Sequence, residues 1–337
     1  MKRHGEEIVH AQMPSTMRSN GNKRAMAKMN NFLSTNTVVC PPELLRQAQA
    51  APTPRVAIAR AGAALPMEAA RDATQAGIME PVFTGERALI EAEADKLDWD
   101  ISAFELIEAE GEEESGKAAA FACGEGRADV LMKGHLHTDV FMKSALNRDA
   151  GLRAGKRLVH IFHIGHPSGG VLTISDAAVN VSPNMETRQD ATREVVRLLH
   201  LLGNDRPKVA FLSATESVIP SVPSSVEASE LAAWAKAEIA DADFSGPLAM
   251  DLILSPEAVA TKKLIDDPVA GQADAIIVPD IVSGNAVFKS AVYMAGGCAA
   301  GIVMGAAVPI LLTSRADPPA ARMASAALAA IVTAANK

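Results

Sequence analysis

The sequence predicts an α/β protein whose mainly parallel sheets are covered on both faces by helices. Of its 337 residues 48% are hydrophobic but only 4% are aromatic, and small and branched aliphatic residues dominate. This composition suits buried parallel strands beneath alanine-rich helices. From Pro41 onward, short apolar runs alternate with longer helical stretches. The length is sufficient for two ordinary domains, each with its own core.

The first half of the chain shows the alternation most clearly. Glycine and proline punctuate it, and Gly77 closes the first predicted helix. A parallel sheet with helices on both faces accommodates such a repeat. Strands are predicted at residues 56–59, 82–83, 104–107 and 130–132, and helices at residues 66–76, 86–97, 117–123 and 138–146.

The second half begins after a basic, glycine-containing turn at residues 148–157, which predicts a domain boundary. Asn184 is predicted to cap a long helix that ends at Leu202 and is stopped by Gly203. Further strands are predicted at residues 159–164, 171–174, 209–212, 275–278, 302–304 and 308–312, and further helices at residues 226–239, 256–264 and 322–335.

Charge and cysteine usage exclude several classes of protein. The formal net charge is −8 and no long Lys/Arg stripe occurs, which argues against a nucleic-acid partner. Cys40, Cys123 and Cys298 are widely spaced, so neither a disulfide framework nor a zinc site is predicted. No uninterrupted apolar run reaches about 18 residues, so no membrane span is predicted. We expect a soluble cytoplasmic protein, with residues 1–36 forming a disordered or loosely attached polar tail.

Polar residues follow the apolar run at residues 308–312. Arg315 could bind a phosphate through charge-assisted hydrogen bonds, and the Ser314 hydroxyl could donate to a developing negative charge. Alternatively, Asp317 caps the last helix with Pro318 at its first position, and Arg315 pairs with Asp317. The pattern favours the cap for Asp317 and leaves the role of Arg315 open.

Two further segments combine polar and small residues after predicted strands. Asp280, Gly284 and Asn285 follow residues 275–278, where backbone N–H groups could approach a ligand, although ordinary turn formation is the better explanation. Asp176 and Asn180 follow residues 171–174 and could line a cleft. They could equally fix a turn through bonds from side chain to backbone, which the residue types favour.

A third segment, residues 133–139, is basic and directly follows a predicted strand. Its His137 and Thr138, with Lys143 one turn into the next helix, could meet an anion. A metal site is the weaker interpretation, because no carboxylate or thiol cluster completes the ligand set. The histidines considered for it are His135, His137, His160, His163 and His166.

These segments follow one another in a recognisable order between Arg55 and Ala330. The carriers are residues 133–139, 175–180, 206–210, 246–251, 268–271, 279–280, 283–285, 308–310 and 313–317. In this succession the chain resembles the phosphate acetyltransferase and phosphate butyryltransferase family, and its Ser-Arg-Ala-Asp pattern looks more like the butyryl-transferring branch.

The resemblance implies a fold like that of isocitrate and isopropylmalate dehydrogenases, with the active site in an interdomain cleft. The first α/β domain would comprise residues 37–157 and 305–337, and the second residues 158–304. It also implies a homodimer or higher homo-oligomer.

The reaction implied is acyl-CoA plus phosphate to acyl phosphate plus CoA, without a metal or a permanently bound cofactor. Arg315 would orient the phosphate, and Ser314 would stabilise the departing sulfur or the tetrahedral oxyanion. The substrate-binding residues implied are Lys143, His137, Thr138, Asp176, Asn180, Asp280, Gly284 and Asn285. Lys143 stands where arginine is expected in acetyl-specific relatives.

Two departures from the family pattern bear on activity. A carboxylate is expected seven residues after Ser314, but that position is Ala321, so Asp317 is the nearest substitute for a general base. Ser245 also occupies a position where aspartate is expected. The alternatives are therefore a catalytically silent CoA-binding relative and, less favoured, a dehydrogenase of the same fold. The acyl chain preference is not legible from the sequence.

Overall fold

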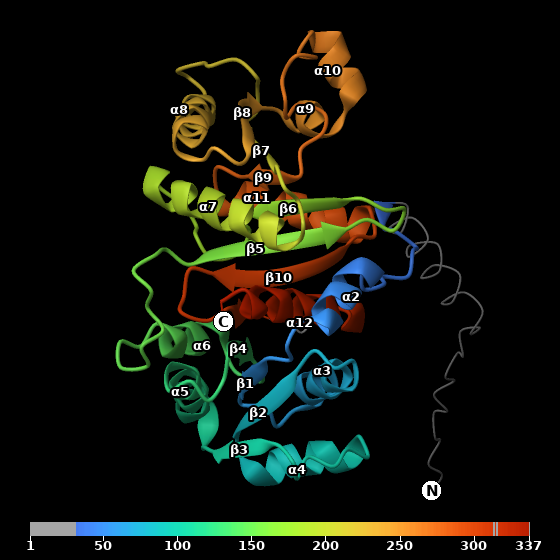
Figure 1. The fold of residues 1–337 in the computed structure, drawn as a ribbon, viewed down its shortest axis with the longest axis vertical. Helices are drawn as coiled ribbons and strands as arrows, with labels where there is room; N and C mark the ends of the chain where they lie inside the picture. Colours follow the sequence, from blue (N-terminus) through green and yellow to red (C-terminus); the bar gives the residue numbers. More distant parts are fainter. Residues whose placement is uncertain (1–31, 313, 315, 337) are drawn as a thin grey trace, which may run out of the picture.

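The computed structural model describes residues 32–312, 314 and 316–336, which form an elongated α/β molecule (Figure 1). The strands succeed one another along its long axis, from β3 at one end to β8 at the other. In chain order the elements are α2 (Pro42–Ala50), β1 (Arg55–Ala59), α3 (Ala64–Gln75), β2 (Glu80–Gly85), α4 (Arg87–Lys96), β3 (Glu105–Glu108), α5 (Gly111–Gly124), β4 (Val130–Lys133), α6 (Thr138–Ala145), β5 (Val159–Gly165), β6 (Val171–Ser175), α7 (Met185–Leu201), β7 (Lys208–Leu212), α8 (Pro223–Glu238), β8 (Asp243–Leu248), α9 (Met250–Leu254), α10 (Pro256–Lys262), β9 (Ala275–Ile277), α11 (Ile281–Lys289), the π-helix η2 (Ser290–Met294), β10 (Cys298–Met304), β11 (Ile310–Leu311) and α12 (Pro319–Ala334).

The described strands form one continuous sheet in the order β3-β2-β1-β4-β11-β10-β5-β6-β9-β7-β8. The strands from β3 to β11 run parallel to one another, and so do β6, β9, β7 and β8. Between these groups β10 and β5 pair antiparallel, so the two groups point in opposite directions. The predicted α/β class with a mostly parallel sheet is confirmed.

The connection between β10 and β11 is the narrowest in the sheet. One register pair, Val303 opposite Ile310, joins these two strands, whereas β10 pairs with β5 along its whole length, from Cys298 to Met304. The sheet therefore has a seam at β10–β11, with β1 to β4 on one side and β5 to β9 on the other.

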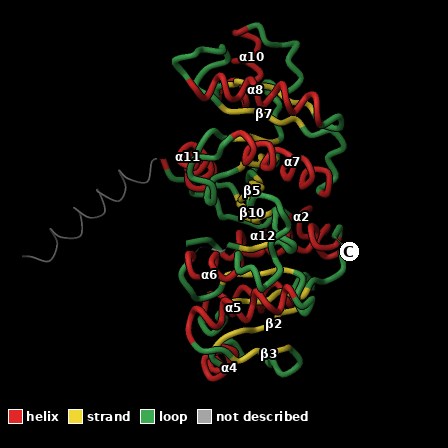
Figure 2. The backbone as a smooth tube through the Cα atoms, turned by 90° about the vertical axis from the view of Figure 1, so that its left-hand side faces the viewer, coloured by secondary structure: helices red, strands yellow, loops and turns green. Residues whose placement is uncertain are grey.

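Helices cover both faces of the sheet, with α6 and α11 on one face and α2 and α7 on the other (Figure 2). Helix α12 lies against β10 and α2 in the middle of the molecule and is buried on almost every side. Its alanine-rich sequence explains this position, because small side chains allow a helix to approach its neighbours closely.

Local signals in the sequence fix several element ends. The Asn184 side chain accepts a hydrogen bond from the Thr187 N–H at 2.9 Å, which confirms the predicted cap of α7. Gly203, just beyond the end of α7, has a φ of 87°, a conformation that glycine adopts without strain.

Residues 1–31, most of the predicted tail, lie outside the described residues. Residues 32–36 run beside the π-helix, where the Ser34 N–H donates to the Tyr293 carbonyl at 2.8 Å. None of the helices in the described part of the chain combines the length and the apolar character that crossing a membrane requires.

Candidate active site

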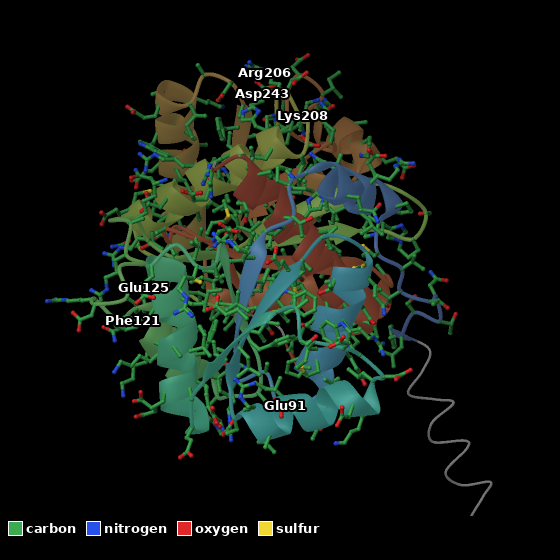
Figure 3. The ribbon with its side chains drawn as sticks, turned by 60° about the horizontal axis from the view of Figure 1, so that its bottom comes forward. Glu91, Phe121, Glu125, Arg206, Lys208 and Asp243 are labelled. Atoms are coloured by element: carbon green, nitrogen blue, oxygen red, sulfur yellow. The ribbon has the colours of Figure 1, made fainter. Side chains whose placement is uncertain are left out.

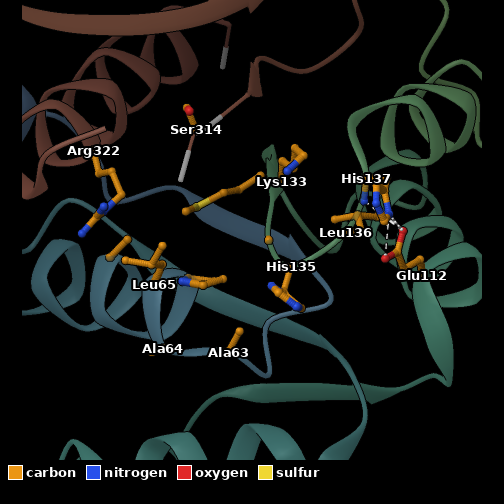
Figure 4. A pocket seen from close by; sticks show the side chains of 14 residues that line it. Ala63, Ala64, Leu65, Glu112, Lys133, His135, Leu136, His137, Ser314 and Arg322 are labelled. Carbon is orange, nitrogen blue, oxygen red and sulfur yellow. Dashed lines mark hydrogen bonds and ion pairs between the residues drawn. The ribbon is translucent and has the colours of Figure 1, made fainter. Parts of the chain in front are cut away.

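Two cavities share part of their lining, and the larger one takes its walls from both sides of the sheet. The large cavity, of about 850 Å³, is bordered by residues 33–38, the β4–α6 loop, β5, α11 with η2, and the β11–α12 loop. The small cavity, of about 330 Å³, is bordered by the start of α3, the β4–α6 loop and α12 (Figure 4). Their shared lining residues are Lys133, Leu136, His137 and Ser314.

The loops come together because β1, β4 and β11 are parallel neighbours, so their carboxyl ends meet at one edge of the sheet. The Gly134 N–H donates to the Ala59 carbonyl at 3.0 Å, and the His135 N–H donates to the Arg60 carbonyl at 2.9 Å. A Cβ at Gly134 would stand 2.3 Å from the Ala59 carbonyl oxygen. Only glycine allows this approach.

Ser314, which lines both cavities, lies beside Asp317, which lines the large one. The Ser314 N–H donates to the Asp317 carboxylate at 2.7 Å, and the Asp317 N–H donates to the Ser314 carbonyl at 3.1 Å. Burial raises the pKa of the Asp317 carboxyl, although the Ser314 N–H and the Arg322 guanidinium oppose this shift. The pair thus combines a hydroxyl with a carboxyl that holds its proton more readily than usual.

The predicted helix cap at Asp317 is wrong. Helix α12 has Pro318 as its N-cap and Pro319 in its first turn, and the Asp317 carboxylate bonds to Ser314 instead. The sequence-predicted Arg315 lies outside the described residues, so its predicted pairing with Asp317 or with phosphate stays a prediction.

His137 and Thr138, which were predicted to contact a ligand, line the large cavity. The Glu112 carboxylate fixes His137: it accepts the His137 N–H at 2.9 Å and lies 2.8 Å from Nδ1. These hydrogen bonds from His137 lower the pKa of the Glu112 carboxyl. Lys143 lines neither cavity; its side chain is 78% exposed and its Nζ lies 3.4 Å from a Glu113 oxygen.

Asp176 and Asn180 fix a turn, as the residue types favoured. The Asp176 carboxylate accepts the His160 and Ala178 N–H groups at 2.9 and 2.8 Å, and the Asn180 amide donates to it at 2.7 Å. The same amide also donates to the Leu158 carbonyl at 2.8 Å. Neither residue lines the two cavities.

The Asp280 to Asn285 segment starts helix α11. The Asp280 carboxylate caps the helix by accepting the Ser283 N–H at 2.9 Å, and Gly284 lies inside the helix, where a Cβ would stand 2.5 Å from the Asp176 carbonyl oxygen. Asn285 alone of the predicted residues in this segment lines the large cavity, and its amide donates to the Ala177 carbonyl at 3.3 Å.

The cavities also contain residues that the sequence did not predict to bind substrate, among them His160, which was weighed only for a metal site. His160 lines the large cavity, is only 3% exposed, and has no hydrogen-bond partner at either ring nitrogen among the described residues. Burial lowers its pKa to about 4. Its ring lies 4.3 Å from that of Phe162, which stacks on Phe288 at 3.8 Å. Arg322, in the small cavity, was likewise not among the predicted site residues.

The predicted histidines do not assemble a metal site in the described part of the chain, where no three His, Cys, Asp or Glu side chains are placed to hold an ion. His163 instead shares a hydrogen bond with the Thr173 hydroxyl at 3.0 Å, and His166 pairs with the Ser168 hydroxyl at 2.7 Å.

Comparison with known proteins identifies the family. Residues 113–330 match the profile described as phosphate acetyl/butaryl transferase. The chain is 36% identical to a phosphate acetyltransferase of Rhizobium meliloti over 78% of this chain and 84% of that protein. It is 34% identical to a phosphate butyryltransferase of Clostridium acetobutylicum over 86% of this chain and 97% of that protein.

A solved structure gives the same result. A branched-chain phosphotransacylase from Enterococcus faecalis V583 superposes with a TM-score of 0.74 at 27% identity, covering 83% of this chain and 98% of that one. The matched residues 113–330 include the β4–α6 loop, β5, α11 and the Ser314–Asp317 pair, which together border the large cavity. The chain therefore belongs to the phosphate acetyl/butyryl transferase family, as the order of its sequence segments predicted.

Proposed function

We propose that this enzyme is a phosphate acyltransferase that converts a short-chain acyl-CoA and inorganic phosphate into an acyl phosphate and free CoA. The observation that carries the proposal is the Ser314–Asp317 pair, which opens onto a cavity of about 850 Å³ within the family-matched region. A cavity of this size is large enough for a substrate of CoA's dimensions to enter in part.

The reaction needs four events at the thioester. A phosphate oxygen attacks the acyl carbon, the carbonyl oxygen becomes an oxyanion, the carbon–sulfur bond breaks, and the sulfur departs as a thiolate that takes up a proton. The Ser314 hydroxyl already accepts the Ala316 N–H at 3.2 Å, which leaves its own proton to donate to the oxyanion or the sulfur. Arg315 would hold the attacking phosphate.

In the reverse direction Asp317 would accept the proton of the CoA thiol. The position where the family is expected to have a carboxylate is Ala321. Its methyl side chain offers no proton acceptor, and it is only 6% exposed and packs in the hydrophobic core. Asp317 is the one carboxylate among the described residues that line the large cavity, and its raised pKa brings it nearer to the pH at which a general base is most effective.

The remaining predicted residues divide by position. His137, Thr138 and Asn285 would contact the acyl-CoA, because they line the large cavity. Asp176, Asn180, Asp280 and Gly284 would position α11 and β5 beside it. Lys143, exposed outside the cavities, would raise the local positive charge for anionic substrates.

We further propose the two-domain division of the isocitrate dehydrogenase-like fold, with residues 37–157 and 305–337 in one domain and residues 158–304 in the other. The seam at β10–β11 supports the boundary near residue 304, and the large cavity takes its walls from both sides of that seam. Helix α12 packs against strands on both sides, so it would tie the domains together.

The physiological form would be a cytoplasmic homodimer or higher homo-oligomer with CoA as substrate and no permanent cofactor. The three cysteines carry free thiols, consistent with a reducing compartment. The acetyl- and butyryl-named relatives stand at similar identity, so the proposed closeness to the butyryl branch rests on the pattern from Ser314 to Asp317.

Thiol release from acetyl-, propionyl- and butyryl-CoA, with and without inorganic phosphate, tests the proposed activity. Phosphate-dependent release with formation of acyl phosphate is the expected result, and the relative rates rank the acyl chains. Release without phosphate would indicate hydrolysis. CoA binding without any release would instead identify a catalytically silent relative, the alternative that the apolar Ala321 favours.

A further inference from the structure

The small cavity lies at the topological switch point of the sheet. In the order β3-β2-β1-β4, the chain moves from β1 outward to β2 and β3 on one side and then returns to β4 on the other. The loops after β1 and β4 consequently diverge, and residues of both line the cavity. In open α/β sheets a crevice of this kind is the usual place for a ligand.

One wall of the small cavity is the amino end of α3, a helix of 12 residues. Its N-cap, Ala63, has an extended backbone (φ −152°, ψ 157°) and no side chain that could accept hydrogen bonds from the first turn. Ala64 and Leu65 line the cavity at this point. The first turn therefore presents the Ala64 and Leu65 N–H groups and a partial positive charge without a partner from its own cap, whereas Pro66 has no N–H to donate.

The opposite wall contains Arg322, which descends from α12 toward the start of α3 (Figure 4). Its side chain is 8% exposed, and Nε has no hydrogen-bond partner among the described residues. One guanidinium nitrogen donates to the Asp317 carbonyl at 2.7 Å, and the nearest carboxylate oxygen, of Glu68, is 4.0 Å away. The guanidinium thus lies near the Glu68 and Asp317 carboxyls, but its buried Nε–H lacks an acceptor, and a buried donor left without a hydrogen bond is costly.

Other side chains around the small cavity can donate hydrogen bonds to an anion as well. Lys133 and His135 line it from the β4–α6 loop. The acidic lining residue Glu112 is engaged by His137 and lies 3.5 Å from the Arg60 guanidinium, so its negative charge is balanced from outside the cavity.

We propose that the small cavity is a phosphate subsite, in which Arg322 and the first-turn N–H groups of α3 together bind one phosphate group. The inference deepens the proposed function and rests on it for the source of that group, which is either inorganic phosphate or a phosphate of CoA. Ser314 lines both cavities, so a phosphate held here shares a cavity wall with one of the proposed reacting groups.

The first test is a pair of substitutions at Ala63. Ala63→Asp and Ala63→Asn both supply a side-chain oxygen that caps α3, and both are expected to preserve or raise the melting temperature. Only the aspartate also places a negative charge at the anion site. We expect Ala63→Asp to weaken phosphate binding at least about tenfold more than Ala63→Asn. A tenfold change in affinity corresponds to the loss of about one hydrogen bond to a charged group. Equal binding by the two variants would overturn the proposal.

The second test replaces Arg322 by glutamine and, separately, by lysine. Calorimetric titration with inorganic phosphate, CoA and dephospho-CoA reports binding without turnover. We expect Arg322→Gln to lose at least about tenfold in affinity for one of these ligands. Arg322→Lys should lose less, because lysine keeps the positive charge but lacks the paired N–H donors of the guanidinium. If Arg322→Gln folds and binds all three as the unmodified protein does, the subsite is refuted.

The three ligands distinguish the sources. Loss of inorganic phosphate binding alone assigns the subsite to the attacking phosphate, loss for CoA but not dephospho-CoA assigns it to the 3′-phosphate, and equal loss for both CoA forms assigns it to the pyrophosphate. Arg206→Gln is the matched control, because Arg206 pairs with Asp243 at the far end of the molecule (Figure 3). Thiol release by the unmodified enzyme is measured separately, so failure of the acyl transfer and failure of the subsite give different results.

Discussion

His163 is buried in the sheet as a neutral side chain, and its environment makes stability depend on pH. Burial lowers its pKa to about 4 from the ordinary value of 6.5. The unfolded chain thus binds a proton as the pH falls below 6.5, while the folded side chain does so only near pH 4. The free energy of unfolding therefore decreases as the pH is lowered through this window, by about 3 kcal/mol at most for this residue.

Urea unfolding between pH 7 and pH 4 checks this prediction in His163→Gln. The substitution is expected to lower stability at pH 7, since it leaves a buried cavity, but to reduce the decrease in unfolding free energy on acidification. His166→Gln is the control, because His166 is exposed and directly follows the same strand. An acid-induced decrease as steep in His163→Gln as in the unmodified protein would show that His163 does not cause it.

Asp317 governs the acidic side of the pH–rate profile if it is the general base. Its pKa is raised by burial, so the rate of acyl transfer to CoA should increase as the pH rises through that elevated pKa. Asp317→Asn is expected to reduce this rate about 10²–10⁴-fold and to abolish the acidic limb, while the asparagine oxygen can still accept the Ser314 N–H. A variant that keeps the limb would assign the proton transfer to another group.

At this scale the sequence predicted part of the site. Ser314 and His137 lie in loops that follow strands, where polar residues are expected at a ligand site, and Asn285 lies in the helix after the next such loop. His160 and Arg322 could not be predicted in the same way, because each occupies a regular position within a strand or helix. Their unpartnered nitrogens become visible only when the surrounding chain is placed.

Among the elements, helix α7 depends on its cap. Asn184→Ala removes the acceptor for the Thr187 N–H and hydroxyl, and should lower the free energy of unfolding by about 1 kcal/mol. Asn184→Asp keeps an acceptor and should retain most of that stability. Thiol release by the folded Asn184→Ala enzyme should not change, because α7 lines neither cavity. Equal urea midpoints for the alanine variant and the unmodified protein would contradict the prediction.

The β1–α3 and β4–α6 loops depend on Gly134 in a similar way. Gly134→Ala would force a methyl group against the Ala59 and Arg60 carbonyl oxygens and push the loops apart. We expect a loss of stability of about 1–3 kcal/mol, together with weaker binding of ligands to both cavities. Thermal unfolding and CoA titration measure the two effects, with Gly155→Ala, in an exposed turn without close neighbours, to separate backbone strain from steric conflict. If Gly134→Ala binds CoA as the unmodified protein does, close packing of Gly134 against the Ala59 and Arg60 carbonyls is not required for binding.

Element positions were largely predictable because glycine, proline and capping residues mark helix ends independently of the rest of the fold. The Asp317 cap, with Pro318 as the first helical residue of α12, was predicted wrongly for a local reason. Pro319 disfavours a helical backbone at the residue before it, so Pro318 stays extended (φ −66°, ψ 157°) and the helix starts one residue later. Asp317 is therefore not the N-cap residue, and its carboxylate accepts the Ser314 N–H instead.

For the whole molecule, the sequence predicted the class and the parallel pairing but not the order of the strands. That β10 and β5 run antiparallel between two parallel groups depends on long-range pairing, which no local pattern records.

The proposed oligomer can be tested at the same scale. Several large apolar side chains are exposed on α11 and η2, among them Val282, which is 74% exposed, and Met294, which is 52% exposed. Light scattering should give a mass of at least twice 35.2 kDa, and the double variant Val282→Lys, Met294→Lys should shift it toward one chain. A single-chain mass for the unmodified protein would contradict the oligomer.

The seam at β10–β11 also has a mechanical consequence. Because one register pair joins these strands while every other neighbouring pair in the sheet is held at more positions, a line parallel to the strands there is the least costly place for the sheet to flex. Bending between β10 and β11 would widen or narrow the large cavity without unfolding any helix. If the two proposed domains move as units about this seam, the enzyme would admit a bulky thioester in an open form and exclude water from it in a closed form.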